Sequence, residues 1–359
     1  MDFLYVNINT MLNKWRKDID KNLASFLKEV NANYKLRLIS NTFFNGIKYF
    51  LQGKGKRIRP LLFLISYHGY TKKRKFSYKN LLRCCLSFEL LHDFMLVHDD
   101  VIDKSALRRG KPTLHKFFNA KLKTHSESDI GQNLGIVVGD FIFTLSIDAF
   151  LSIEEDSKRK YLALRKFLEA AASTSIGEFI DVIDGWKKPA SINEKRVFLN
   201  YTLKTAKYTF ESPLLTAAIL SGAGKKELAR ISKMAILFGQ AFQIQDDMLG
   251  VLATSREIGK PILCDLAESK KTLLVCETFK NLNRNDRSIF KDLLEKKTKN
   301  YKDLKKFRSL LKKSRADTYC QNKINSLLRQ AYSILSKLKM KKKFKVLLRK
   351  YLGSLFLRN

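Results

Sequence analysis

Three aspartates stand close together at residues 99–103, where an otherwise apolar segment reads Asp-Asp-Val-Ile-Asp. If this segment is a helix, Asp99 and Asp103 lie one turn apart on the same face, with about 6 Å between their Cβ atoms. Two carboxylates that face the same way repel each other and are costly to remove from water. Either they cap a helix or pair with the following Arg108 and Arg109, or they bind a cation.

A second acidic pair, Asp246-Asp247, interrupts another apolar segment much later in the chain. Two helices that each carry carboxylates into an apolar interior are explained if those side chains converge on hard cations. Magnesium fits, because it takes oxygen ligands and is usually completed by waters and substrate phosphates. Each acidic cluster has too few ligands to hold Mg²⁺ by itself. A diphosphate that bridges both clusters would supply the missing oxygens.

Basic residues of the kind that bind phosphate accompany the two acidic clusters. Arginine offers a planar fork of donors and lysine a compact charge, and both are usual phosphate ligands. Any one of these residues alone is more often surface charge, but their order around two carboxylate clusters favours a diphosphate site. They occur in the segments GKRIRP (55–60) and RRGK (108–111) and at Lys204, Lys260, Lys270 and Lys271.

The composition predicts that long helices position these residues. The chain has 359 residues, of which 45% are hydrophobic, and only 5 Pro and 16 Gly interrupt them. Apolar residues recur at spacings of three and four, and residues 82–97 and 141–150 are apolar nearly all round. Helices of that kind lie buried in the middle of a large bundle. We therefore predict one all-α domain over residues 1–359.

The formal net charge of +35 leaves several partners open. Nucleic acid, a diphosphate substrate, an anionic membrane surface and a lysine-rich solvated exterior would each explain it. For the basic last forty residues we favour a packed helix with a solvated face over a weak membrane-surface contact. No run of about 18 apolar residues predicts a transmembrane segment. Five cysteines without a CxxC pattern predict neither disulfides nor zinc, so we expect a cytoplasmic protein.

The motifs together resemble the trans-isoprenyl diphosphate synthases of the polyprenyl synthetase family, from about residue 40 to the C-terminus. The segments that carry the resemblance follow the family's order along the chain. They are GKGKRIRP, FELLHDFMLVHDDVIDKSALRRGKPTLH, GIVVGDFIF, GEFIDVIDG, KTAKYTF, FGQAFQIQDDMLGV and EIGKPILCDLAESKKTLL. The sequence departs from the family pattern at Lys54, Glu178 and Gly250, where a glycine, a glutamine and an aspartate are usual. Gly250 leaves Asp246 in place, so activity is still expected.

The resemblance implies the isoprenoid synthase fold, a large helical bundle around a deep central cavity. It implies a prenyltransferase that condenses isopentenyl diphosphate with an allylic diphosphate, head to tail and trans, to a linear short-chain isoprenyl diphosphate. Three Mg²⁺ ions are expected, with Mn²⁺ as a substitute, and so is a homodimer that binds no nucleic acid.

The resemblance also assigns roles to residues that match the family's motifs. Asp99, Asp103 and Asp246 are expected to hold the metal ions. The expected ligands of the allylic diphosphate are Arg108, Lys204 and Lys260, and those of isopentenyl diphosphate are Lys56, Arg59, His92 and Arg109. Thr205 and Gln243 are expected to face the reacting carbons, with Asp247 and Lys270 in the same shell. His92 could instead be an ordinary core histidine.

Phe94 and Met95 are candidates for the floor that limits product length. Phe94 lies five residues before Asp99, so its Cα is about 7.5 Å further along a helix axis. An aromatic residue only at this position resembles the archaeal-type geranylgeranyl synthases, whereas Met95 is flexible and yields more readily. We therefore expect the twenty-carbon geranylgeranyl diphosphate, with a farnesyl or longer product as the alternative. Phe94 could also be ordinary core.

Three other functions compete with this interpretation. A class I terpene cyclase could share the fold and the first acidic motif, but GKRIRP and QDDMLG argue against it. A non-catalytic partner subunit of a heteromeric synthase usually loses an acidic motif, and this chain keeps both. A basic helical nucleic-acid binder would explain the charge but not the paired carboxylates.

Overall fold

The computed structural model describes residues 2–53, 55–123, 129–252, 270–296, 298 and 300–357. Nearly all regular structure in these ranges is helical, and this confirms the predicted all-α class. The described strands are two residues long each, β1 (Leu107–Arg108) and β2 (Lys111–Pro112), and they pair antiparallel.

The chain divides into two compact units. Unit 1 contains residues Met1–Arg165 and Thr216–Ala223, and unit 2 contains Lys166–Leu215 and Gly224–Asn359. The expectation from the sequence, that the whole chain forms one domain, stays a prediction. Each unit has its own set of charged residues, and the two are described in turn.

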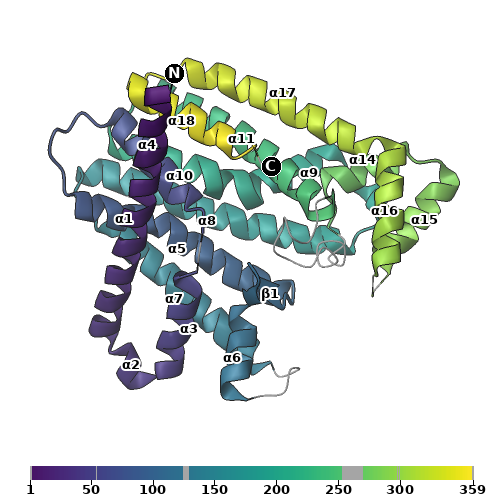
Figure 1. Ribbon diagram of the computed structural model, residues 1–359, viewed down its shortest axis with the longest axis horizontal. Coiled ribbons are helices and arrows are strands. Elements are labelled where there is room, and N and C mark those ends of the chain that lie inside the picture. Colours follow the sequence, from purple (N-terminus) through teal and green to yellow (C-terminus); the bar gives the residue numbers. More distant parts are fainter. Residues whose placement is uncertain are drawn as a thin grey trace. The chain divides into compact units, whose positions relative to one another are not determined.

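Unit 1 is built around α5, which carries the first acidic cluster. The helix α5 packs against α1, α4 and α7 (Figure 1). Both α4 and α5 are apolar around most of their circumference, which explains why residues 61–65 are completely buried. The helices are α1 (Asp2–Tyr34), α2 (Leu36–Ile39), α3 (Asn41–Leu51), α4 (Ile58–Tyr70), α5 (Tyr78–Ile102), α6 (Leu114–Leu122), α7 (Ile130–Leu151) and the first part of α8 (Ser157–Trp186).

Unit 2 is built around α11, which carries the second acidic cluster. The helix α11 packs along α17 (Figure 1). It also packs against η2. The segments are the rest of α8, η1 (Pro189–Ser191), α9 (Glu194–Asn200), η2 (Tyr201–Glu211), part of α10 (Ser212–Leu220), α11 (Lys225–Leu252), α14 (Leu273–Asn281), α15 (Arg284–Glu295), α16 (Tyr301–Ser314), α17 (Ala316–Ser336) and α18 (Lys342–Ser354).

Segment η2 is a π-helix, a form that occurs frequently at functional sites. Its neighbours approach it closely because they carry glycine at the contact. A Cβ at Gly177 of α8 would lie 2.5 Å from the backbone nitrogen of Lys204. A Cβ at Gly239 of α11 would lie 2.4 Å from the Cα of Ala206. These glycines let two helices press on the backbone of η2 on either side of Thr205.

The sequence predicts no transmembrane segment, but one described helix, α7, meets the length and composition criteria for one. By length and composition alone, α7 is long and apolar enough to cross a membrane. In the structure α7 packs against α5 and α6, and 44% of its most apolar stretch is buried. A core helix passes the same test, so the composition of α7 is weak evidence for a membrane segment.

Gly239→Ala should destabilise the protein by about 1–3 kcal/mol, because the new methyl group would overpack against Ala206. Gly185→Ala is the matched control on a helix, since a Cβ there meets nothing within 4 Å. Its unfolding free energy should stay within about 1 kcal/mol of wild type or rise. Urea unfolding of both variants measures the difference, and equal stabilities would contradict the close contact.

Candidate active site

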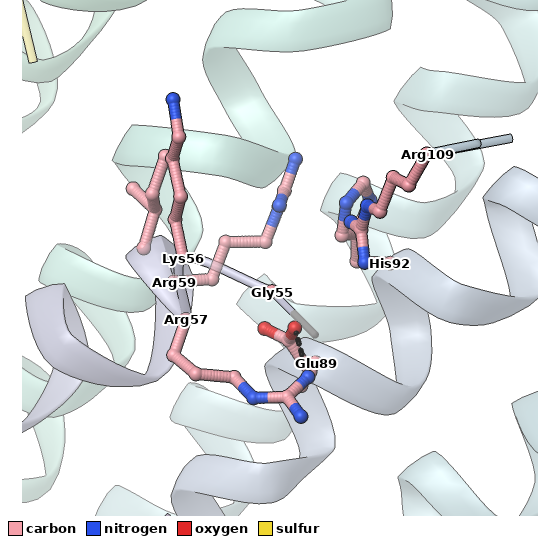
Figure 2. Close-up of a pocket in the computed structure, with 8 residues that line it drawn as sticks. Gly55, Lys56, Arg57, Arg59, Glu89, His92 and Arg109 are labelled. Atoms are coloured by element: carbon pink, nitrogen blue, oxygen red, sulfur yellow. Dashed lines mark hydrogen bonds and ion pairs between the residues drawn. The ribbon is translucent and has the colours of Figure 1, made fainter. Parts of the chain in front are cut away.

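Unit 1 contains a pocket of about 490 Å³ lined mainly by basic side chains. Lys56, Arg59, His92 and Arg109, which the family resemblance assigns to one diphosphate, all line it (Figure 2). They come from the loop before α4, from α4 and α5, and from the β1–β2 turn. The structure therefore brings these four residues together, while their role stays a prediction. The full lining is Gly55, Lys56, Arg57, Ile58, Arg59, Glu89, His92 and Arg109.

Arg57 holds the loop that presents Lys56 and was not singled out from the sequence. Its backbone is left-handed, with φ of 52°, and its side chain is only 5% exposed. The guanidinium donates to Asp20 Oδ1 of α1 at 2.9 Å, to Glu89 Oε1 of α5 at 2.8 Å and to Gly53 O at 3.2 Å. Figure 2 marks the contact between Arg57 and Glu89 with a dashed line. Arg57 thus ties the loop to two helices.

The pocket favours an anion. Burial lowers the pKa of His92 well below its usual value, and the charges of Arg59 and Arg109 lower it further. His92 is therefore neutral at pH 7 and lies among cations. Burial, followed by the charge of Glu89, raises the pKa of Asp93 well above its usual value. With His92 neutral and Glu89 paired with Arg57, Lys56, Arg59 and Arg109 supply positive charge to the pocket.

The first acidic cluster has the predicted one-turn spacing. The backbone N–H of Asp103 donates to Asp99 O at 2.8 Å, because Asp103 caps the end of α5. Asp100 faces the interior and is completely buried, whereas the side chain of Asp99 is 23% exposed. Arg108 binds Asp100 through Nε and Nη2, at 2.8 and 2.7 Å, and reaches Asp99 Oδ2 at 3.1 Å. The pairing with Arg108 weighed from the sequence therefore exists, and it mainly involves Asp100.

A two-residue hairpin turn separates the tasks of the two neighbouring arginines. Arg109 and Gly110 both have positive φ, 53° and 74°, as the tightest hairpin turn requires. Arg108, on strand β1, faces the carboxylates of α5. Arg109, in the turn, lines the pocket. The RRG sequence therefore presents the guanidinium of Arg108 to the carboxylates of α5 and that of Arg109 to the pocket.

In unit 2, Asp247 is held by two hydrogen-bond donors. The Tyr201 hydroxyl donates to Asp247 Oδ2, and Gln243 Nε2 donates to Oδ1 at 2.8 Å. Thr205 Oγ1 donates in turn to Gln243 Oε1 at 2.5 Å. Burial raises the pKa of Asp247 to about 7, aided by the charge of Asp246 and opposed by the two hydrogen bonds. The structure thus joins Thr205 and Gln243 by a hydrogen bond, while their expected role at the reacting carbons stays a prediction.

Lys204 lies between two carboxylates of α8. Its Nζ is 2.8 Å from Glu178 Oε2 and 2.6 Å from Asp181 Oδ2. Asp181 was missed, although its place one turn after Glu178 in GEFIDV could have signalled it. These carboxylates hold the ammonium group in place by charge. Lys270 lies three residues before α14, and Lys260 lies outside the described residues.

Within the described ranges, no three His, Cys, Asp or Glu side chains form a group that could hold a metal ion. The carboxylates at Asp99 and Asp103 are nevertheless hard oxygen donors on one helix face. Mg²⁺ is commonly bound by one or two carboxylates and completed by substrate phosphates and water. The residues present therefore fit Mg²⁺ brought together with a diphosphate.

The profile of the polyprenyl synthetase family matches residues 41–311. The chain belongs to the polyprenyl synthetase family. The geranylgeranyl diphosphate synthase of Sulfolobus acidocaldarius is 30% identical over 284 residues, 76% of this chain and 80% of the relative. The short chain isoprenyl diphosphate synthase of Methanocaldococcus jannaschii is 26% identical over 295 residues, 82% of this chain and 83% of the relative. The predicted enzyme class, a prenyltransferase, is confirmed.

The fold of this synthetase also agrees with a solved structure. A geranylgeranyl pyrophosphate synthase from Corynebacterium glutamicum, complexed with isoprenyl diphosphate and magnesium, superimposes with a TM-score of 0.88. The match covers 97% of this chain and 99% of that one, at 20% identity. This likeness shows the isoprenoid synthase fold.

The candidate floor residue of the synthetase, Phe94, belongs to an aromatic cluster. Its ring lies 5.0 Å from that of Phe143 on α7 and 4.7 Å from that of His98. Phe94 and Met95 are both partly exposed, as a residue beside a substrate space would be. Their role in product length stays a prediction.

Arg57→Met should lower the free energy of unfolding by about 3–5 kcal/mol, because it leaves Glu89 buried without its cation. Lys56→Met makes the same chemical change at the exposed neighbour and should alter stability by less than about 0.5 kcal/mol. Urea unfolding gives both values.

The Lys56 variant should instead bind inorganic pyrophosphate roughly tenfold more weakly, since a charge-assisted hydrogen bond is lost. Isothermal titration measures this affinity. Wild-type stability of Arg57→Met would show that Arg57 is not the anchor of the loop.

Proposed function

We propose that the enzyme joins isopentenyl diphosphate to an allylic diphosphate, head to tail and trans, and releases a linear isoprenyl diphosphate. The observation that carries the proposal is the pocket lined by Lys56, Arg59, His92 and Arg109. It offers three cations and a neutral imidazole to one anion. Membership in the polyprenyl synthetase family supports the assignment of that anion to isopentenyl diphosphate.

The proposed reaction breaks the allylic C–O bond and forms a new C–C bond. Arg108, Lys204 and Lys260 bind the allylic diphosphate, and Lys270 lies in the same shell. The Thr205 and Gln243 oxygens face the allylic cation, which the double bond of isopentenyl diphosphate attacks. The departing diphosphate accepts the proton that is then lost. No protein nucleophile takes part in this scheme.

We propose Asp99, Asp103 and Asp246 as the residues that hold three divalent ions, Mg²⁺ or Mn²⁺. When bound, the ions neutralise charge on the leaving diphosphate. The one-turn spacing of Asp99 and Asp103 supports this, because residues four apart at the end of a helix are neighbours on its surface. The synthase of Corynebacterium glutamicum that shares the fold was solved with magnesium bound.

For the product we propose geranylgeranyl diphosphate. The relatives' names vary, from farnesyl in Geobacillus stearothermophilus to geranylfarnesyl in Aeropyrum pernix and octaprenyl in Haemophilus influenzae. The argument for twenty carbons is therefore the aromatic side chain of Phe94, backed by Phe143. Two aromatic side chains packed together form a firmer floor than Met95 would.

We also propose a cytoplasmic homodimer. Large apolar side chains are exposed on two helices, Ile136 and Val137 on α7 and Phe179 and Trp186 on α8. On each helix these side chains supply apolar area for an interaction surface, and a second copy would cover it. Free thiols at Cys84, Cys85, Cys276 and Cys320 agree with a reducing compartment.

Asp99→Ala and Asp103→Ala should each lower turnover by at least about 10³-fold, because each removes a ligand of the ions that neutralise the leaving group. Condensation of labelled isopentenyl diphosphate with each allylic diphosphate in Mg²⁺ measures this. Wild-type rates in either variant would contradict the metal assignment. A wild-type protein inactive with every allylic diphosphate would favour the non-catalytic subunit.

Phe94→Ala should lengthen the product by one or more five-carbon units, since it opens the floor. Phe141→Ala is the control, because that ring packs on Tyr34 and Phe43 instead. Chromatography of the dephosphorylated products gives the chain length. An unchanged product from Phe94→Ala would remove this residue from the floor.

A further inference from the structure

A chain of hydrogen bonds leads from the start of α14 to Thr205. The backbone N–H of Leu273 donates to the Tyr201 hydroxyl at 2.9 Å, and that hydroxyl donates to Asp247. Gln243 Nε2 also donates to Asp247, at 2.8 Å, while its Oε1 accepts from Thr205 at 2.5 Å. Tyr201 and Thr205 are buried. All five residues belong to unit 2.

The direction of this chain follows from its chemistry. The Gln243 amide turns its nitrogen toward Asp247, 2.8 Å from Oδ1, and the carboxylate oxygen accepts this hydrogen bond. The amide oxygen then faces Thr205, and the Thr205 hydroxyl must use its proton to reach that oxygen. Only the lone pairs of the hydroxyl oxygen can then interact with another group. Asp247 therefore determines whether the Thr205 hydroxyl presents its lone pairs or its proton to that group.

On the same two helices, a neighbouring glutamine–threonine pair forms its hydrogen bond in the opposite direction. Gln240 Nε2 donates to Thr202 Oγ1 at 2.9 Å, and Thr202 Oγ1 donates to Phe198 O at 2.8 Å. Gln240 and Thr202 each lie three residues before Gln243 and Thr205. Packing of α11 on η2 thus allows either orientation of the amide. The difference at Gln243 is the contact with Asp247.

We propose that Asp247 and Tyr201 are positioning residues that make Thr205 present its lone pairs, and not its proton, to the allylic cation. This inference rests on the proposed function, in which the Thr205 oxygen faces that cation. A fixed dipole that points its negative end at developing positive charge needs no reorganisation during the reaction. A reversed hydroxyl would point a proton at the cation and oppose its formation.

Asp247→Asn tests the inference because it keeps the shape of the side chain and reverses the direction of the hydrogen bonds that lead to Thr205. The asparagine oxygen would accept from Tyr201, so its NH₂ would face Gln243. The Gln243 amide would then turn over and donate to Thr205, which would release the hydroxyl proton toward the substrate. At pH 8 we expect kcat to fall roughly 10–100-fold. The KM for isopentenyl diphosphate and the Mg²⁺ concentration for half-maximal rate should not change.

The double variant separates positioning from other roles. Thr205→Val should lower kcat by itself, and Thr205→Ser should restore most of it. Asp247→Asn added to Thr205→Val should cause no further loss, because Asp247 acts through the Thr205 hydroxyl. Thr202→Val is the matched control, since it breaks the neighbouring Gln240 bond, and its kcat should equal that of wild type.

Several results would overturn the inference. They are a wild-type kcat for Asp247→Asn, losses that multiply in the double variant, or a raised Mg²⁺ requirement, which would make Asp247 a metal ligand. If Asp247→Asn does not fold, Tyr201→Phe tests the same chain, because it removes a donor that holds the Asp247 carboxylate. It should lower kcat several-fold in the enzyme that has Thr205 and cause no further loss in Thr205→Val. An inactive wild-type enzyme would refute the proposed function as well, whereas an active one with unaffected variants refutes the positioning role alone.

Discussion

The cost of burying charge is the constraint on which both units of this synthetase depend. A charge inside a helical interior is tolerated only with a partner and hydrogen bonds. Arg57 is bound to Glu89, Asp100 to Arg108, and Asp247 accepts from Tyr201 and Gln243. Arg57, Asp100 and Asp247 belong to the short motifs KRIR, DDVID and QDD. Each is held in its motif by the contacts just named. These residues fix the backbone on which Lys56, Asp99 and Asp246 are carried.

This arrangement reconciles two explanations of the acidic residues that the sequence had set against each other. Pairing with arginine and the proposed binding of a cation are compatible within residues 99–103, because neighbouring carboxylates on a helix face different ways. Asp100 is completely buried and bidentate with Arg108, while Asp99 keeps 23% of its side chain exposed. Arg108 touches both, so it connects the buried pair with Asp99, the carboxylate proposed to hold metal ions.

Sequence reasoning predicted what depends on local spacing and residue type. Helical periodicity predicted the all-α class and the one-turn spacing of Asp99 and Asp103. The family resemblance grouped four residues that the structure places in the lining of one pocket. Sequence reasoning could not predict partners from distant segments, such as Asp20 for Arg57 or Tyr201 for Asp247, because no spacing rule links them. The π-helix at η2 was missed for a related reason. Its geometry depends on close approach at Gly177 and Gly239, which is a property of packing.

The central proposal is that Asp99, Asp103 and Asp246 hold divalent ions that bind a diphosphate. Isothermal titration of inorganic pyrophosphate, with and without Mg²⁺, tests it without any chemical step. Wild type should bind pyrophosphate much more tightly when Mg²⁺ is present, and Asp99→Asn and Asp246→Asn should each abolish that gain. If Asp246→Asn kept the full Mg²⁺-dependent gain while Asp99→Asn lost it, Asp246 would not hold such an ion and the proposal would be wrong.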